Sequence, residues 1–217
     1  TWLTFVHPDR RERRNMWAYL ILTLGSLVFW SLYQMAPNGL QLFAVNNVHL
    51  ELWGIRIAPQ WVEDINTVVI VIGGPLLAML FARLRRTRGW RIDIPQQFTT
   101  SLLLMGLGFL ALPVGIHFAD ATGRSPFFWL FLSYVLQSIG ELLISPIGYA
   151  MIGKLAPSKY QGVMMGSWMM VTGVASLFAG DLSGMVPEPT GTTAAATNGG
   201  YGTLFTYLGL GSVVAGL

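Results

Sequence analysis

The sequence predicts an all-α, polytopic membrane protein built as a bundle of six transmembrane helices. Of its 217 residues, 53% are hydrophobic and only 11% are charged, whereas a soluble domain usually carries about 25% charged residues. The apolar residues are gathered in six long runs. About 20 helical residues cross a hydrocarbon core of about 30 Å, and a membrane barrel would show alternating segments of about ten residues instead. The long continuous runs therefore predict helices.

Six spans are expected in order along the chain. The first covers residues 16–45 and contains Pro37, which predicts a kink. The sequence begins without Met and ends within an apolar run, so we interpret it as a piece of a longer protein. Residues 1–15 form a basic lead-in, and the loop at 186–200 is expected to be a flexible outer connection. The bundle occupies residues 16–217, with the remaining spans near 61–83, 97–118, 127–153, 162–186 and 201–217, the last truncated.

The positive charges predict the orientation of the chain. Only Arg56 and Arg124 lie on the side opposite the basic clusters. Lys and Arg close to span ends are retained on the cytoplasmic side, so residue 1 is expected in the cytoplasm. We interpret these side chains as loop charges rather than as nucleic-acid or substrate ligands. Eleven of the 13 basic residues fall in alternate connections: Arg10, Arg11, Arg13, Arg14, Arg83, Arg85, Arg86, Arg88, Arg91, Lys154 and Lys159.

An enzyme within the membrane is not expected. Such an enzyme needs a nucleophile with a base, or a metal cluster, at membrane depth. The sequence has no cysteine, and its three histidines, His7, His49 and His117, are scattered. Neither a disulfide framework nor a thiolate metal site is therefore available.

Glu141 is the first candidate for a functional residue. It lies near the middle of the apolar stretch 127–152, and an ionisable group at that depth costs about 2.5 to 3.5 kcal/mol. Such a group normally faces a cavity or a partner. A purely structural pairing with a buried base is the alternative. Glu63 and Asp64 stand at the mouth of the second span, and Asp181 lies towards the end of the fifth, where a solvated or capping role is expected.

Two spans share a pattern of polar residues four positions apart next to a proline. Residues at this spacing lie on one helix face, and a polar face beside a helix-breaking proline is typical of repeats that line a central pathway. The first span carries Trp30, Gln34 and Asn38 with Pro37, and the fourth carries Gln137, Glu141 and Ser145 with Pro146.

Several motifs resemble one known family. Residues 29–34 (FWSLYQ), Ile65-Asn66 ahead of Gly74-Pro75, the stretch 140–157 (GELLISPIGYAMIGKLAP) and residues 162–168 (GVMMGSW) look like the proton-dependent oligopeptide transporter family. This family belongs to the major facilitator superfamily. The resemblance covers almost the whole chain, as helices seven to twelve, and implies the C-terminal half of that fold.

The resemblance also implies substrate-binding roles. Glu141 and Asn66 match residues that face the amino end of the peptide, and an interhelical hydrogen bond is the alternative for Asn66. Ser145 resembles a substrate-side serine, although bonding back to its own helix explains it equally well. Trp30 and Trp168 resemble the pair of tryptophans that flank side-chain pockets.

Gln34 is a departure from the family pattern. Many members carry a glutamate there that takes up the driving proton and forms a salt bridge across the outer gate. Glutamine cannot titrate, so proton coupling is expected to use Glu141, groups in the other half, or another stoichiometry.

The expected function is import of di- and tripeptides with protons by alternating access, with no cofactor beyond the coupling proton. The expected partners are the peptide, the lipid bilayer and an N-terminal six-helix half, with no nucleic acid. No basic residue lies deep within the spans, so the carboxylate of the peptide should meet that other half. A bacterial inner membrane is the expected location. A transporter for another solute, such as an amino acid or nitrate, and an assembly subunit remain as alternatives.

Overall fold

The computed structural model describes residues 10–52, 54–88, 93–155, 158–187 and 193–217. Part of the basic lead-in, Arg91 and the Ala156-Pro157 end of the long motif lie outside the described residues. Five helical stretches are long and apolar enough to cross a membrane, at Arg13–Asn47, Pro59–Thr87, Ile94–His117, Phe127–Gly153 and Gln161–Gly184. A sixth long helix, α8 (Ala194–Gly216), completes the bundle.

The other elements follow the expected order. The helical segments are α2 (Arg10–Tyr33), η1 (Ala36–Leu40), α3 (Gln41–Asn47), α4 (Pro59–Arg88), α5 (Ile94–His117), α6 (Phe127–Leu155), η2 (Ser158–Tyr160) and α7 (Gln161–Gly184). Four two-residue strands join them at one end: β1 (Val48–His49), β2 (Glu51–Leu52), β3 (Ile55–Arg56) and β4 (Ser125–Pro126). β1 pairs in parallel with β4, and β2 pairs with β3 in an antiparallel hairpin. The all-α prediction is confirmed.

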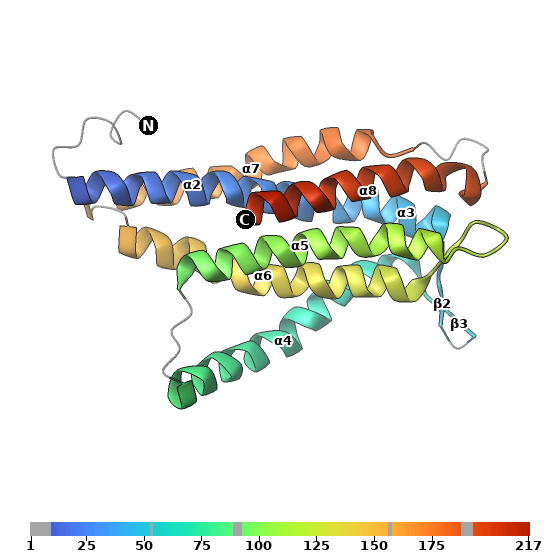
Figure 1. Cartoon of the computed structure of the whole chain (residues 1–217), viewed down its shortest axis with the longest axis horizontal. Helices are drawn as coiled ribbons and strands as arrows, with labels where there is room; N and C mark the ends of the chain where they lie inside the picture. The colour runs from blue at the N-terminus through green and yellow to red at the C-terminus, as the bar shows by residue number, and fades with distance from the viewer. Residues whose placement is uncertain (1–9, 53, 89–92, 156–157, 188–192) are drawn as a thin grey trace.

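Most of the helices run along the long axis of the molecule, and α4 diverges from them (Figure 1). α5 lies between α6 and α8 and contacts both, whereas α4 leaves apolar side chains such as Val71, Leu76 and Met79 exposed. A bilayer or another part of the protein is the natural cover for such a surface.

Glycine allows α5 and α8 to come close together. A Cβ atom on Gly209 would lie 2.9 Å from the carbonyl oxygen of Gly106, and one on Gly106 would lie 2.7 Å from the carbonyl oxygen of Gly209. Small residues at helix interfaces let backbones approach and gain van der Waals contact where lipid offers no hydrophobic driving force. Phe43, Phe109 and Phe205 form an aromatic cluster beside this contact, with centroids of Phe205 at 5.2 Å and 6.0 Å from the other two.

The two prolines of the polar faces behave differently. Pro37 lies in the π-helical segment η1, where the N–H of Leu40 donates to Met35 O at 3.2 Å, so the predicted interruption of the first span is confirmed. Pro146 lies inside α6, which continues to Leu155. The expectation that Pro146 breaks its helix is therefore wrong.

The last helix begins earlier than predicted. The sequence predicts a flexible loop up to residue 200 and a span at 201–217. In the structure α8 already starts at Ala194, so residues 194–200 are helical. Asn47 explains the difference, because its fully buried Nδ2 donates to the carbonyl of Ala194 at 3.0 Å and to Thr197 Oγ1 at 2.8 Å. A contact across some 150 positions of sequence thus anchors the first turn.

A polar cluster organises the connections at the same end. Asp120 Oδ2 lies 2.6 Å from His49 Nε2, and Asp120 Oδ1 accepts from the backbone N–H groups of Thr122 and Arg124. The hydrogen bond with His49 and those from Thr122 and Arg124 hold the pKa of Asp120 well below its ordinary value of 3.8. This exposed pair links the end of the first span to the α5–α6 connection.

Substituting Gly209→Ala should lower the stability of the protein by about 1 to 3 kcal/mol, because the methyl group enters space held by Leu110 and the Gly106 carbonyl. The measurement is the thermal unfolding midpoint in detergent. Gly211→Ala is the matched control on the same helix, since no heavy atom lies within 4 Å of its added Cβ. Equal midpoints for the two variants would contradict close packing of α5 on α8.

Candidate functional site

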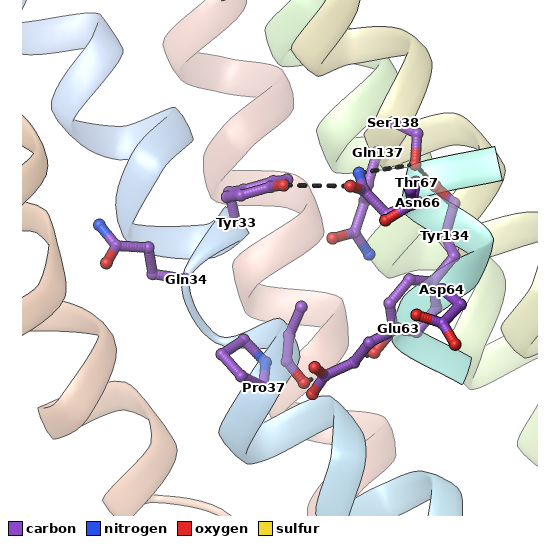
Figure 2. A pocket seen from close by; sticks show the side chains of 11 residues that line it. Tyr33, Gln34, Pro37, Glu63, Asp64, Asn66, Thr67, Tyr134, Gln137 and Ser138 are labelled. Carbon is purple, nitrogen blue, oxygen red and sulfur yellow. Dashed lines mark hydrogen bonds between the residues drawn. The ribbon is translucent and has the colours of Figure 1, made fainter. Parts of the chain in front are cut away.

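A polar cavity lies where α2 ends and where α4 and α6 begin. Its volume is about 350 Å³. Side chains from these three helices and from η1 converge on it (Figure 2). The lining residues are Tyr33, Gln34, Ala36, Pro37, Glu63, Asp64, Asn66, Thr67, Tyr134, Gln137 and Ser138.

The interrupted first span shapes one wall of this cavity. α2 ends at Tyr33 and the chain re-enters helical structure at Ala36, with Pro37 lacking the N–H that a continuous helix would use. The backbone carbonyl of Ala36 accepts a long hydrogen bond of 3.5 Å from the hydroxyl of Tyr134 on α6. The break therefore turns Tyr33 and Gln34 to the cavity and couples this wall to α6.

Asn66 links three helices at the centre of the site. Its Oδ1 accepts from the hydroxyl of Tyr33 on α2 at 3.4 Å. Its Nδ2 donates to Ser138 Oγ at 3.0 Å and to Glu141 Oε2 at 2.9 Å, both on α6. The structure thus brings together Asn66 and Glu141, which the sequence singled out from separate spans.

Glu141 is half-buried and reaches the cavity through Asn66 rather than lining it. A carboxylate within an apolar bundle needs hydrogen-bond donors to offset its lost hydration. The amide of Asn66 supplies one, and no Lys or Arg in the described part of the chain forms an ion pair with Glu141. Glu141 is therefore available to a cation that enters from outside this bundle.

Gln34 lines the same cavity and bonds away from Asn66. Its Nε2 donates to the carbonyl of Thr172 on α7 at 2.8 Å. This bond joins the turn that follows α2 to α7 at the level of the helix break. The expected role of position 34 in proton coupling stays a prediction.

The other three predicted site residues lie outside the cavity lining. Ser145 is half-buried and makes no side-chain hydrogen bond with any residue that the structure describes. The ring of Trp30 packs 5.5 Å from those of Phe29 and Tyr33, and its buried Nε1 has no partner within the described ranges. Trp168 is 5% exposed and lies flat on Gly148, where a Cβ would come within 2.2 Å of the indole. Their roles towards a substrate stay predictions.

Several lining residues were not singled out from the sequence as site residues. Tyr33 stands within the first motif, Gln137 belongs to the predicted polar face, and Ser138 lies one turn before Glu141. Glu63 and Asp64 were noticed only as acids at the mouth of a span. For the residues on α4 and α6 the shared signal is position, because Glu63, Asp64, Gln137 and Ser138 each lie within about one helical turn of Asn66 or Glu141.

The chemistry of the lining favours a cation over an anion. Two carboxylates and several amide and hydroxyl groups line the cavity, and none of its described lining residues is Lys, Arg or His. Across the described ranges, no group of three His, Cys, Asp or Glu residues is arranged to hold a metal ion. The site therefore suits an organic cation such as an ammonium group.

Comparison with known proteins assigns the family. The model of the POT family of peptide transporters matches residues 2–199. The chain belongs to the POT family. It is 40% identical over 177 residues to the dipeptide and tripeptide permease A of Cronobacter turicensis, covering 82% of this chain and 35% of the relative.

Other members of the POT family agree with this assignment. The permease A of Edwardsiella piscicida is 36% identical over 204 residues, covering 93% of this chain and 41% of that protein. The crystal structure of a peptide transporter POT in complex with sulfate superposes with a TM-score of 0.85 at 26% identity, covering 99% of this chain and 41% of the other. The POT chain thus spans about two fifths of these relatives and is a multi-pass membrane protein with a major facilitator fold. Its relatives are permeases rather than enzymes.

Asn66→Asp should destabilise the protein by about 1 to 3 kcal/mol at pH 8, because the new carboxylate cannot donate to Glu141 and repels it. The loss should shrink towards pH 5, where one proton bound between the two carboxylates restores a donor. Thermal unfolding midpoints at both pH values provide the measurement. Asn38→Asp is the control, since Asn38 is exposed and bonds only through its backbone. A loss that does not depend on pH would mean that positions 66 and 141 are not coupled.

Proposed function

We propose that this chain is the C-terminal half of a proton-coupled secondary transporter that imports di- and tripeptides by alternating access. The relatives named as dipeptide and tripeptide permeases support this substrate class. The chain spans about two fifths of their length, which fits one half of a two-bundle transporter. The other half would supply the second wall of the substrate site.

The observation that carries the proposal is the bond between Asn66 and Glu141 beside a polar cavity. A carboxylate and an amide oxygen together accept the three N–H donors of a peptide's amino end. Charge-assisted hydrogen bonds of this kind are about twice as strong as neutral ones. Glu141 and Asn66 therefore hold the amino end, and Ser145, Trp30 and Trp168 contact the rest of the peptide as the other half closes.

The same carboxylate serves the coupling ion. Glu141 binds a proton in the absence of substrate. When a peptide enters, the ammonium group takes the place of this proton on Glu141, and the proton passes to a group of the other half and moves inward together with the peptide. Gln34 cannot take part by titration. The proposed location is the bacterial inner membrane with residue 1 in the cytoplasm, and the basic residues in alternate connections support this orientation.

The peptide carboxylate requires a different partner. Within the part of the chain that the structure describes, no basic side chain lines the cavity. Basic residues of the N-terminal half are the proposed partner, and they would fix the length of the peptide by their distance from Glu141. Nitrate, an anion, finds no such group among the described residues of this half, so a peptide is the better-supported solute.

Glu141→Gln in the full-length transporter should reduce proton-driven uptake by about tenfold or more, because the amide loses the charge that binds the ammonium group and the proton. The assay is uptake of a labelled dipeptide into liposomes under an inward proton gradient. Glu51→Gln, which changes an exposed residue of β2, is the matched control. Undiminished uptake by Glu141→Gln, with normal folding, would remove Glu141 from the mechanism.

Gln34→Glu should change the pH dependence of uptake, because it adds a titratable carboxylate to the cavity wall. The profile is measured with the same liposomes between pH 5 and 8. Gln60→Glu adds the same charge at an exposed position at the start of α4 and serves as control. If the Gln34→Glu profile matches that of the wild type, position 34 is a bystander.

A further inference from the structure

The hydrogen-bonding groups of the cavity are unbalanced, because its donors are largely occupied by the protein. Every side-chain amide in the lining, and every tyrosine and serine hydroxyl, already donates to a protein acceptor. Thr67 has a hydroxyl without an acceptor among the described residues, and this hydroxyl can equally accept; Gln34 and Gln137 each keep one further amide N–H. The donor and acceptor pairs are Tyr33 to Asn66, Gln34 to Thr172, Asn66 to Ser138 and Glu141, Tyr134 to Ala36, Gln137 to Ser133, and Ser138 to Tyr134.

The acceptors, in contrast, are left open. Gln137 is only 2% exposed, and while its Nε2 donates to Ser133 Oγ at 2.9 Å, its Oε1 accepts no hydrogen bond from any described residue. Figure 2 shows the amide end of Gln137 directed into the cavity between Tyr33 and Tyr134. This oxygen of an otherwise buried side chain is therefore open to a donor from a ligand or from water in the cavity.

Two carboxylates extend this set of open acceptors. Glu63 and Asp64 follow one another on α4 and both line the cavity, and Glu63 reaches from α4 towards Pro37 (Figure 2). Neither forms an ion pair or a side-chain hydrogen bond with a residue in the described ranges. A ligand that satisfies Glu63, Asp64 and Gln137 must therefore bring positive charge and several N–H groups.

The open acceptors stand one helical turn from the pair proposed to bind the amino end. Glu63 precedes Asn66 by three residues on α4, and Gln137 precedes Glu141 by four on α6. Residues at these spacings share one helix face. On both helices the open acceptor lies N-terminal to its partner in the first pair. Glu63 and Gln137 therefore form a second level of the site, about one helical turn or 5.4 Å from Asn66 and Glu141.

We infer that this second level, formed by Glu63, Asp64 and Gln137, binds a cationic side chain and makes the transporter prefer peptides that contain lysine or arginine. The inference rests on the proposed function. A lysine or arginine side chain carries its charge on a flexible apolar stem that spans one helical turn. The amino end of the peptide then binds to Asn66 and Glu141, and the cationic group of the side chain binds to the acceptors of the second level.

The test is competition in the full-length transporter reconstituted into liposomes. Uptake of labelled dialanine is inhibited with alanyl-lysine, dialanine or alanyl-glutamate. Alanyl-lysine should inhibit about tenfold more strongly than dialanine, and alanyl-glutamate more weakly, because charge-assisted hydrogen bonds are the strong ones. In the double variant Glu63→Gln, Asp64→Asn the preference should fall to within about twofold, with dialanine uptake retained.

Two further variants make the result decisive. Glu51→Gln removes an acid outside the cavity and should leave the preference unchanged. Glu63→Lys reverses the charge and should favour alanyl-glutamate over alanyl-lysine. A wild type that takes up dialanine but does not distinguish the three peptides overturns this inference alone, as does a double variant with an unchanged preference. Absence of any dipeptide uptake by the wild type overturns the proposed function and this inference with it.

Discussion

A carboxylate inside an apolar bundle has to find a donor, and the bond from Asn66 on α4 to Glu141 on α6 meets that need. Asn66 also accepts from Tyr33 on α2 and donates to Ser138, so one amide joins three helices at the polar cavity. The bond satisfies Glu141 without neutralising it. A charge that is stabilised but not paired can bind either a proton or an ammonium group, which is the basis of the proposed coupling between proton uptake and the binding of a peptide's amino end.

The rest of the bundle holds these helices in place around that bond. Gly106 and Gly209 let α5 and α8 meet backbone to backbone, and Gly148 accepts the flat ring of Trp168. The interruption at Pro37 is the complementary feature, because it opens the end of the first span and exposes polar groups that a continuous helix would cover. Close packing on one side and a broken helix on the other thus position a polar cavity within a largely apolar protein.

The acidic character of the cavity, taken with the proposed function, assigns separate tasks to the two halves of the proposed transporter. This half presents the open acceptors of Glu63, Asp64 and Gln137 beside the amino-end site, and none of the described lining residues is cationic. Recognition of a peptide's carboxylate then depends on the other half. In this proposal the two halves close only on a substrate that has both a free amino end and a free carboxylate. Because the distance between these two groups depends on the number of residues, closure would select peptides by length.

The helices of this protein could be predicted from the sequence because their signal is local. The length of each apolar run decides whether it can cross a bilayer, and Glu141 stands out against its apolar neighbours. Asn66, which follows Glu63 and Asp64, was predicted only from the family resemblance. The start of α8 at Ala194 could not be predicted in this way, because small and polar residues have no hydropathy signal and the anchoring donor is Asn47, far away in sequence. The sequence likewise did not show that Pro146 leaves its helix unbroken, because a proline inside an apolar span is compatible with either a break or a continuous helix. Sequence by itself therefore determined the membrane bundle, its family motifs and the lone acid at its centre, whereas only the tertiary structure decided that Glu63 and Gln137 share one cavity with Asn66, because that depends on how separate helices pack.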